Sequence, residues 1–148
     1  MPSNVIDRET VQVDLAAKIA AKFGATWDVF DYKTVSFNGK ARNIVVSAAG
    51  SRREIKGADA DDADTSFRFR VYIFILYQDI ANGWTEKNSE TELNAAEKKL
   101  TDLLDDNQEA TYWNRIYFDA ESDPDMIVDE GGQTFRREIF SIRAEKYT

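Results

Sequence analysis

The hydrophobic pattern is most regular from residue 67 to residue 79, FRFRVYIFILYQD, where apolar side chains occupy every second position. Successive side chains of a strand point to opposite faces, so residues 67, 69, 71, 73, 75 and 77 form one continuous apolar face. The other face begins with Arg68 and Arg70 and becomes apolar towards its centre. This pattern predicts a central strand of a sheet, with helices or a partner subunit over much of both faces.

The segment from about residue 8 to residue 23 has the period of an amphipathic helix. Asp7 or Asn4 can accept hydrogen bonds from its first free amides. Gly24 tolerates the positive φ that commonly ends a helix. The apolar stripe repeats every four residues, at Val11, Leu15, Ile19 and Phe23.

A second helix is predicted from about residue 90 to residue 106. Ser89 with Glu92 matches a capping box, in which the hydroxyl and the carboxylate satisfy each other's backbone amides. A leucine stripe could also be a coiled-coil seam, but two heptads are too few, so packing against the sheet is the favoured interpretation. The stripe consists of Leu93, Ala96, Leu100, Leu103 and Leu104.

Shorter alternating patterns predict further strands at about residues 26–33, 42–48, 113–119 and 133–146. Asn38-Gly39 is a favoured pair for a two-residue hairpin turn, although the pairing around it stays open. Residues 121–132 are predicted to be a polar loop. The element order does not follow a regular βαβ alternation, so we expect an α+β fold. Its mixed, largely antiparallel sheet would have four to five strands packed by two main helices.

Residues 49–66, AGSRREIKGADADDADTS, are predicted to form a long polar loop. With few apolar side chains it does not offset its ordering entropy by burial, so we expect it to be mobile unless a partner holds it. DADDAD could be a calcium site, but it lacks the glycine and distal glutamate of an EF-hand loop, which favours a solvated acidic loop. A basic cluster precedes an acidic one, at Arg52, Arg53 and Lys56, then Asp59, Asp61, Asp62 and Asp64.

Composition bounds the possible functions. A chain of 148 residues, 43% of them hydrophobic, predicts a single domain with its own core. The net charge of −8 disfavours direct binding to duplex DNA. The sequence contains neither cysteine nor histidine, which excludes disulfides, thiolate metal sites, thiol nucleophiles and Ser-His arrangements.

No enzyme and no cofactor are predicted. Most acidic residues fall in polar loops or on helix faces, whereas acid–base pairs need one carboxyl buried beside apolar walls. Gly131-Gly132 lacks the Lys-Ser/Thr of a phosphate-binding loop. The first ten residues do not resemble a signal peptide, and the longest apolar run, residues 71–77, is too short for a membrane span. We therefore expect a soluble intracellular protein.

The order and texture of these elements resemble the tail terminator, or tail-completion, proteins of long-tailed bacteriophages. The resemblance covers nearly the whole chain and is carried by FRFRVYIFILYQD, ETELNAAEKKLTDLLDD and REIFSIRAEKY. It implies a structural virion protein, assembled in the host cytoplasm, that forms a ring, typically a hexamer, on the head-proximal end of the tail tube. The ring would stop tube polymerisation and join the tail to the head connector.

The implied partners are other copies of the chain, the tail tube protein and a connector or neck protein, without a membrane. DNA would pass through the acidic channel without specific binding. Exposed aromatics such as Trp113 and Tyr117 could extend sheet pairing between subunits. Two alternatives stay open: another neck component of similar fold, or a small non-viral adaptor or binding module. The expected interface residues are Arg52, Arg53, Lys56, Asp59, Asp61, Asp62, Asp64, Arg68 and Arg70.

Overall fold

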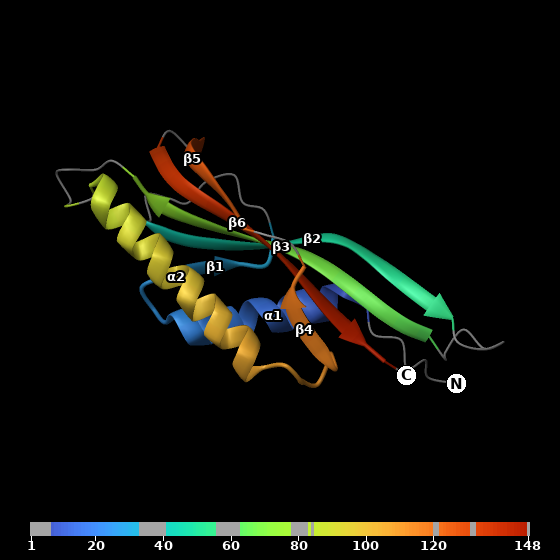
Figure 1. Ribbon diagram of the computed structural model, residues 1–148. Helices are drawn as coiled ribbons and strands as arrows, with labels where there is room; N and C mark the ends of the chain where they lie inside the picture. The colour runs from blue at the N-terminus through green and yellow to red at the C-terminus, as the bar shows by residue number, and fades with distance from the viewer. Residues whose placement is uncertain are drawn as a thin grey trace.

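A computed structural model shows two helices on one side of a twisted sheet (Figure 1). It describes residues 7–32, 41–55, 63–77, 83, 85–119, 122–130 and 133–147. These ranges contain the helices α1 (Arg8–Phe23) and α2 (Glu86–Asp106), and the strands β1 (Asp28–Phe30), β2 (Arg42–Ile55), β3 (Ala63–Leu76), β4 (Arg115–Phe118), β5 (Asp123–Glu130) and β6 (Gln133–Lys146). The predicted α+β class, with two helices and a largely antiparallel sheet, is confirmed.

The main path of the sheet has the order β1-β2-β3-β6-β4, so the long alternating strand β3 is central, as predicted. β1 pairs with β2 in parallel, and the other pairs are antiparallel. β4 and β5 pair with successive stretches of the same edge of β6. Among the described residues, the sheet is therefore five strands wide at the end that holds β1 and β5, and four strands wide at the end that holds β4.

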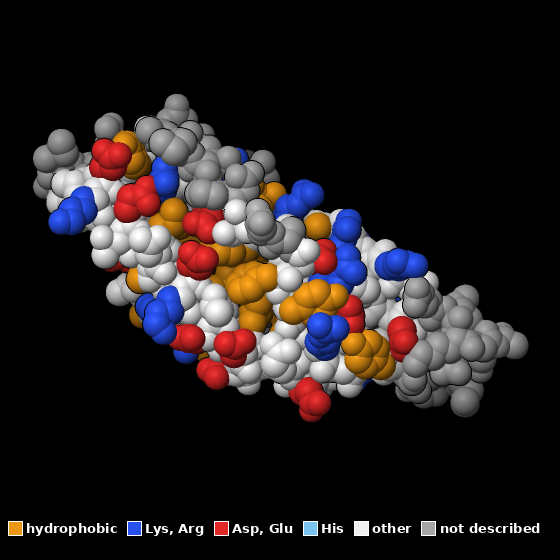
Figure 2. Space-filling model, in the orientation of Figure 1, with side chains coloured by type: hydrophobic (Ala, Val, Ile, Leu, Met, Phe, Trp, Pro, Cys, Tyr) orange, Lys and Arg blue, Asp and Glu red, His pale blue; other side chains and the backbone are white. Residues whose placement is uncertain are grey.

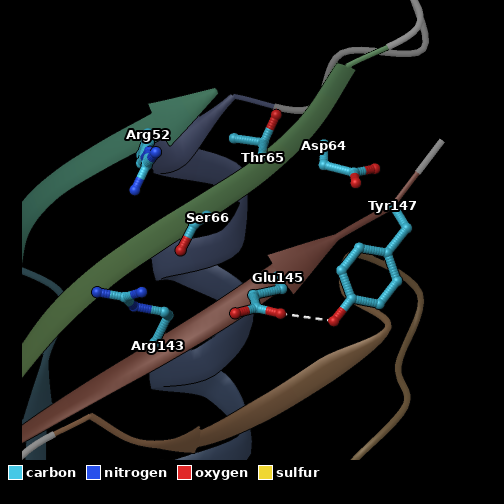
Figure 3. Close-up of a pocket in the computed structure, with 7 residues that line it drawn as sticks. All are labelled: Arg52, Asp64, Thr65, Ser66, Arg143, Glu145 and Tyr147. Carbon is cyan, nitrogen blue, oxygen red and sulfur yellow. Dashed lines mark hydrogen bonds between the residues drawn. The ribbon is translucent and has the colours of Figure 1, made fainter. Parts of the chain in front are cut away.

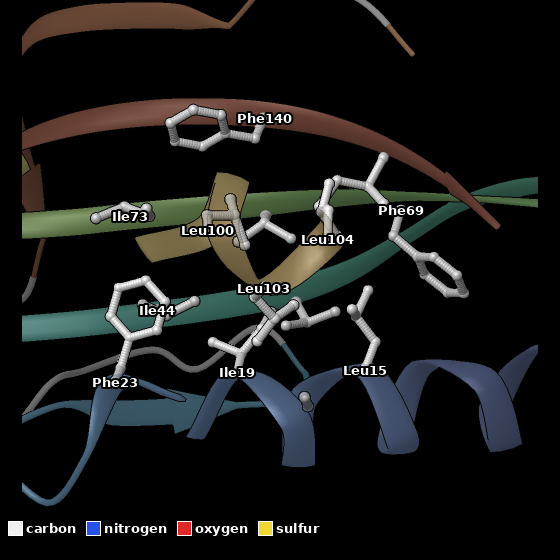
Figure 4. Packing of buried hydrophobic residues seen from close by; sticks show 14 of the residues in the cluster. Leu15, Ile19, Phe23, Ile44, Phe69, Ile73, Leu100, Leu103, Leu104 and Phe140 are labelled. Carbon is white, nitrogen blue, oxygen red and sulfur yellow. The ribbon is translucent and has the colours of Figure 1, made fainter. Parts of the chain in front are cut away.

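Both described helices cover the same face of the sheet. In the core, Leu15 and Ile19 of α1 and Leu103 of α2 meet Phe69 and Ile73 of β3 (Figure 4). The opposite face has a smaller cluster of apolar residues from strands: Val45, Phe74, Leu76 and Phe135. The sequence predicted helices or a partner subunit over much of both faces, and among the described residues helices cover one of them.

The first helix has its expected ends. The backbone amide of Thr10 donates to the Asp7 carboxylate at 2.7 Å, so Asp7 is the N-cap. Gly24 has a φ of 86° and ends the helix by donating its N–H to the carbonyl of Ala20. The period-four stripe and its two capping residues were sufficient to place this helix.

The second helix begins four residues earlier than predicted, because Thr85 caps it by accepting from the Asn88 amide at 3.2 Å. The capping-box prediction is therefore wrong. Ser89 lies inside the helix, fully buried, and donates to the carbonyl of Leu76 at 2.7 Å. Glu92 forms an ion pair with Arg42 at 3.1 Å instead of closing a helix end.

The predicted loop at residues 49–66 is also wrong for most of its length. β2 continues to Ile55 and β3 begins at Ala63, so residues 50–55 pair with residues 63–68 in an antiparallel ladder. A register shift at Ala48 and Gly50 interrupts this ladder once. The apolar half of β3 sets the pairing with β2, and this pairing continues through the polar residues at the end of both strands. It can do so because backbone hydrogen bonds between strands do not require apolar side chains.

Other expected elements differ in extent. Residues 123–130, predicted to be loop, form β5 along β6. The first strand shortens to β1 and pairs in parallel with β2, so these two strands do not form a hairpin with each other. The Asn38-Gly39 turn lies outside the described residues. Trp113, predicted to be an exposed strand residue, precedes β4 and is fully buried, with its indole N–H bonded to the carbonyl of Asn107 at 2.8 Å.

Candidate functional site

Alternate residues of β3 separate the helix-covered face of the sheet from its open face. Phe67 and Phe69 belong to the core beneath the helices, whereas Arg68 and Arg70 are exposed on the opposite face. Cross-strand pairing places Arg143 of β6 opposite Arg68, and Arg52 of β2 opposite Ser66. We call four of the arginines on this open face the arginine face: Arg52, Arg68, Arg70 and Arg143.

This surface lies behind the helix-covered core at Arg68, Arg70 and Arg143, and continues with Arg52 towards the end of the hairpin of β2 and β3. In Figure 1, β2 and β3 run beyond the ends of α1 and α2 towards the end of the molecule where both termini lie. On the right-hand half of the visible face, Lys and Arg side chains lie among Asp and Glu side chains (Figure 2). The protein as a whole carries a net charge of −8, so the arginine face is a local reversal of its charge.

The predicted interface residues are only partly brought together. Arg52, Arg68 and Arg70 share the open face, but Arg53 follows Arg52 on a strand and therefore lies on the helix side, where it donates to the Thr65 hydroxyl at 3.3 Å. Asp64 lies near Arg52, since both line one hollow. The remaining predicted residues, Lys56, Asp59, Asp61 and Asp62, lie outside the described residues.

Sequence reasoning missed Arg143. Arg143 joins the arginine face only because the register between β3 and β6 sets it opposite Arg68. The local sequence of β6 gives no indication of which strand lies beside it. A half-buried ion pair with Asp119, 3.2 Å long, also holds its guanidinium.

A hollow of about 210 Å³ opens beside the arginine face. Figure 3 shows Ser66 between Arg52 and Arg143, with Glu145 on the adjoining strand β6 and Tyr147 just beyond the end of that strand. The Ser66 hydroxyl and the Nε of Arg143 are both buried, and neither has a hydrogen-bond partner among the described residues. The residues that line the hollow are Arg52, Asp64, Thr65, Ser66, Arg143, Glu145 and Tyr147.

Glu145 is the most strongly engaged acid of this hollow. Its two carboxylate oxygens accept hydrogen bonds from the Tyr117 hydroxyl at 2.6 Å and the Tyr147 hydroxyl at 2.5 Å. These hydrogen bonds hold the pKa of Glu145 below its ordinary value. Burial and the bond to Glu145 raise the pKa of Tyr117, and the same carboxylate raises that of Tyr147. At neutral pH the group is therefore one carboxylate held by two neutral phenols.

A buried carboxylate, Glu138, lies elsewhere, under α2. Only 7% of it is exposed, and burial raises its pKa. The carboxylates of Glu97 and Glu90 raise this pKa further, while a hydrogen bond with Ser122 and the charge of Arg136 lower it. Glu138 has no second buried carboxylate beside it among the described residues, so the pair needed for concerted acid–base chemistry is not formed there.

No protein-family model matches this chain, and no curated protein matches it significantly. Across the described ranges, no group of three or more acidic, His or Cys side chains is arranged to hold a metal ion. None of the described helices is long and apolar enough to cross a membrane. The functional interpretation therefore rests on the resemblance and on the surface geometry.

Proposed function

We propose that this chain is a structural virion protein of a long-tailed bacteriophage, which forms a homo-oligomeric ring on the head-proximal end of the tail tube. The ring stops tube polymerisation and joins the tail to the head connector. The observation that supports this proposal is the charged hairpin of β2 and β3 that extends past the helices. Such an extension presents a large backbone and side-chain surface that the chain's own core does not use.

The charge distribution favours contact with another acidic protein surface. Arg68 and Arg70 are exposed in a molecule whose acidic residues outnumber its basic ones by 27 to 19. A second copy of the chain is thus itself a complementary partner. Contacts between two different patches on neighbouring copies are heterologous, and such contacts close into rings when the rotation permits.

Another neck component of similar fold is the nearest alternative. It would use the same hairpin and the same charged surface, but it would bind an existing tail end without stopping the growth of the tube. A small adaptor or binding module would instead stay monomeric. Assembly state and tube length therefore separate the three functions.

The test combines sizing with a tube-polymerisation assay. Light scattering after gel filtration, together with electron microscopy, should show a ring, either alone or upon addition of the tail tubes of the source phage. Growing tubes should stop at a defined length in its presence. A monomer that leaves tube growth unchanged would overturn the proposal.

A matched pair of variants tests the surface. Arg68→Glu with Arg70→Glu reverses two exposed charges on the arginine face, so we expect the loss of capping while circular dichroism stays unchanged. Lys98→Glu reverses one charge on α2, where the lysine side chain is 78% exposed, and should cap normally. Equal capping by both variants would remove the arginine face from the mechanism.

A further inference from the structure

One edge of the sheet is open along the second half of β2. β1 pairs with β2 only at residues 43–45. The Gln12 amide then donates to the carbonyls of Asp31 at 2.7 Å and Val46 at 3.0 Å, which closes the gap where the two strands separate. From residue 47 to residue 55, no strand among the described residues lies on the outer side of β2. An edge strand of this kind presents a row of outward backbone groups that can pair with another chain.

The opposite edge of the sheet is formed by β4 and β5. β4 is short, and the Gln108 amide donates to the carbonyl of Ile116 at 2.9 Å, which partly blocks its edge. β5 pairs with β6 on one side only, and no described strand lies on its other side. The long open stretches of the described sheet are therefore residues 47–55 of β2 and 123–130 of β5.

These two stretches differ in charge. The open part of β2 includes the exposed residues Arg52 and Arg53. β5 has the sequence DPDMIVDE, with four acidic residues and neither lysine nor arginine. Opposite charges on facing strands favour pairing, whereas like charges directly opposite each other disfavour it. Charge thus favours β2 against β5 over either strand against a copy of itself.

Strand direction also suits this match. Each step from β2 to β3, to β6 and to β5 is antiparallel, so β5 runs opposite to β2 within one chain. If neighbouring copies continue the same sheet, the β2 of one copy lies antiparallel to the β5 of the next. Antiparallel ladders are slightly more stable per residue than parallel ones. With the irregularity of β5 between Asp125 and Val128, full overlap of the two stretches sets Arg52 next to Asp125. Both positions belong to the open face, because Asp125 pairs with Arg137 and Arg137 pairs with Phe74.

We propose that copies of this chain associate head to tail through a new antiparallel strand pair, between residues 47–55 of one copy and residues 123–130 of the next. This inference rests on the proposed function, because it identifies the two strands that join neighbouring copies in the proposed ring. It is heterologous, because two different edges meet, and every copy keeps one edge of each kind for its next neighbour.

Disulfide trapping tests the strand pair directly, because the chain contains no cysteine of its own. In the overlapped register Ser51 lies opposite Ile127. Mixing the Ser51→Cys and Ile127→Cys proteins under mild oxidation should give a cross-linked dimer. One chain that carries both substitutions should give a ladder of multimers that ends at the ring size. Ser51→Cys mixed with Lys98→Cys measures random collision, since Lys98 lies on the exposed side of α2.

Two results would overturn the proposed pairing. Cross-linking of Ser51→Cys with itself above the collision control would indicate a two-fold β2–β2 contact. Equal yields for the Ile127→Cys and Lys98→Cys mixtures would exclude the β2–β5 contact. A ring without the specific cross-link overturns the strand pair and leaves the proposed function standing. Cross-linked multimers that leave tail-tube length unchanged support the strand pair and overturn the proposed function.

A charge exchange tests why the two edges select each other. Arg52→Glu and Asp125→Lys, each alone, should lower the trapped yield by about twofold to fivefold, the range expected for a surface ion pair. The protein with both substitutions restores the attraction with reversed signs and should recover the yield. Arg52 also lies beside Asp64 in the hollow, so recovery in the double variant separates the intermolecular effect from damage to the hairpin. Failure of the double variant to recover would contradict the selection by charge.

Discussion

The carboxylate of Glu145 shows how single residues fix the end of the sheet next to the arginine face. Tyr117 reaches it from β4 and Tyr147 reaches it from just beyond β6. The Arg115 guanidinium also stacks over the Tyr117 ring, 4.4 Å from its centre. These contacts join β4 to the C-terminal end of β6, where β6 also supports the hairpin.

Tyr117→Phe removes one of the two hydrogen bonds to Glu145. We expect a loss of about 1 kcal/mol in the free energy of unfolding at neutral pH, because the bond is charge-assisted but half-exposed. Urea denaturation measures this loss. Tyr147→Phe is the matched control and should cost less, since Tyr147 is 43% exposed. Two equal, negligible effects would mean that the carboxylate does not fix this end of the sheet.

The same carboxylate predicts a pH dependence. The folded-state pKa of Glu145 lies below its ordinary value of 4.5, so its contribution to stability is present above that value and lost as the pH falls through the folded-state pKa. The wild-type protein should therefore lose more stability than Tyr117→Phe when urea denaturation is repeated at progressively acidic pH. Parallel pH curves for the two proteins would contradict this assignment.

At the scale of elements, the start of α2 distinguishes two ways in which a serine or threonine can act. Thr85 caps the helix at its end, whereas Ser89, one turn later, ties the helix to the last residue of β3 through a buried hydrogen bond. The bond from Ser89 fixes how far α2 slides along the sheet, because its acceptor belongs to the central strand.

Ser89→Ala and Thr85→Ala should both destabilise the protein. The first leaves the Leu76 carbonyl without its hydroxyl donor, at a cost of about 1–3 kcal/mol, and the second removes an N-cap, at about 1 kcal/mol. Thermal or urea unfolding measures both. Thr91→Ala, at an exposed position of the same helix, is the neutral control. If Thr85→Ala left the free energy of unfolding unchanged, Ser89 would be favoured as the helix cap.

The elements that the sequence predicted well are those with an apolar period. α1 has its predicted ends because Val11 and Leu15 begin a clear stripe and Asp7 offers a cap. β5 and the outer half of β2 were missed because most of their residues are polar and the apolar run at residues 126–128 does not alternate, so neither segment has a periodic signal. Their pairing depends on a ladder that starts elsewhere in the chain, which the local sequence does not encode.

The same limit applies to the candidate site. Alternation in β3 was enough to place Arg68 and Arg70 on one face. Arg52 and Arg53 were grouped together because a loop imposes no alternation, whereas on a strand they point to opposite faces. Arg143 required the register between β3 and β6. The sequence was therefore enough to predict which residues of one strand share a face. The structure was needed to find which residues of neighbouring strands lie opposite each other.

At the scale of the whole molecule, the charge of the arginine face sets how assembly responds to salt. Screening shortens the reach of exposed charges to about 10 Å at 0.1 M salt and about 3 Å at 1 M salt. We expect ring formation and tube capping to weaken steadily as salt rises, and the Arg68→Glu, Arg70→Glu protein to lose most of this dependence. Light scattering over a salt series measures both. Stronger assembly at high salt would indicate an apolar contact in place of the arginine face.

The staggered ends of the sheet set the pitch of any assembly built by strand addition. Asp125 is level with Asn43 across β6 and β3, yet the proposed pair sets it beside Arg52 of the next copy, nine residues further along β2. Each new copy would therefore shift by about 30 Å along the strands while its four strands advance the sheet by about 19 Å across them. A closed ring then requires strands inclined by about 60° to its axis, steeper than in most barrels. With a smaller inclination, the same contacts would build a spiral.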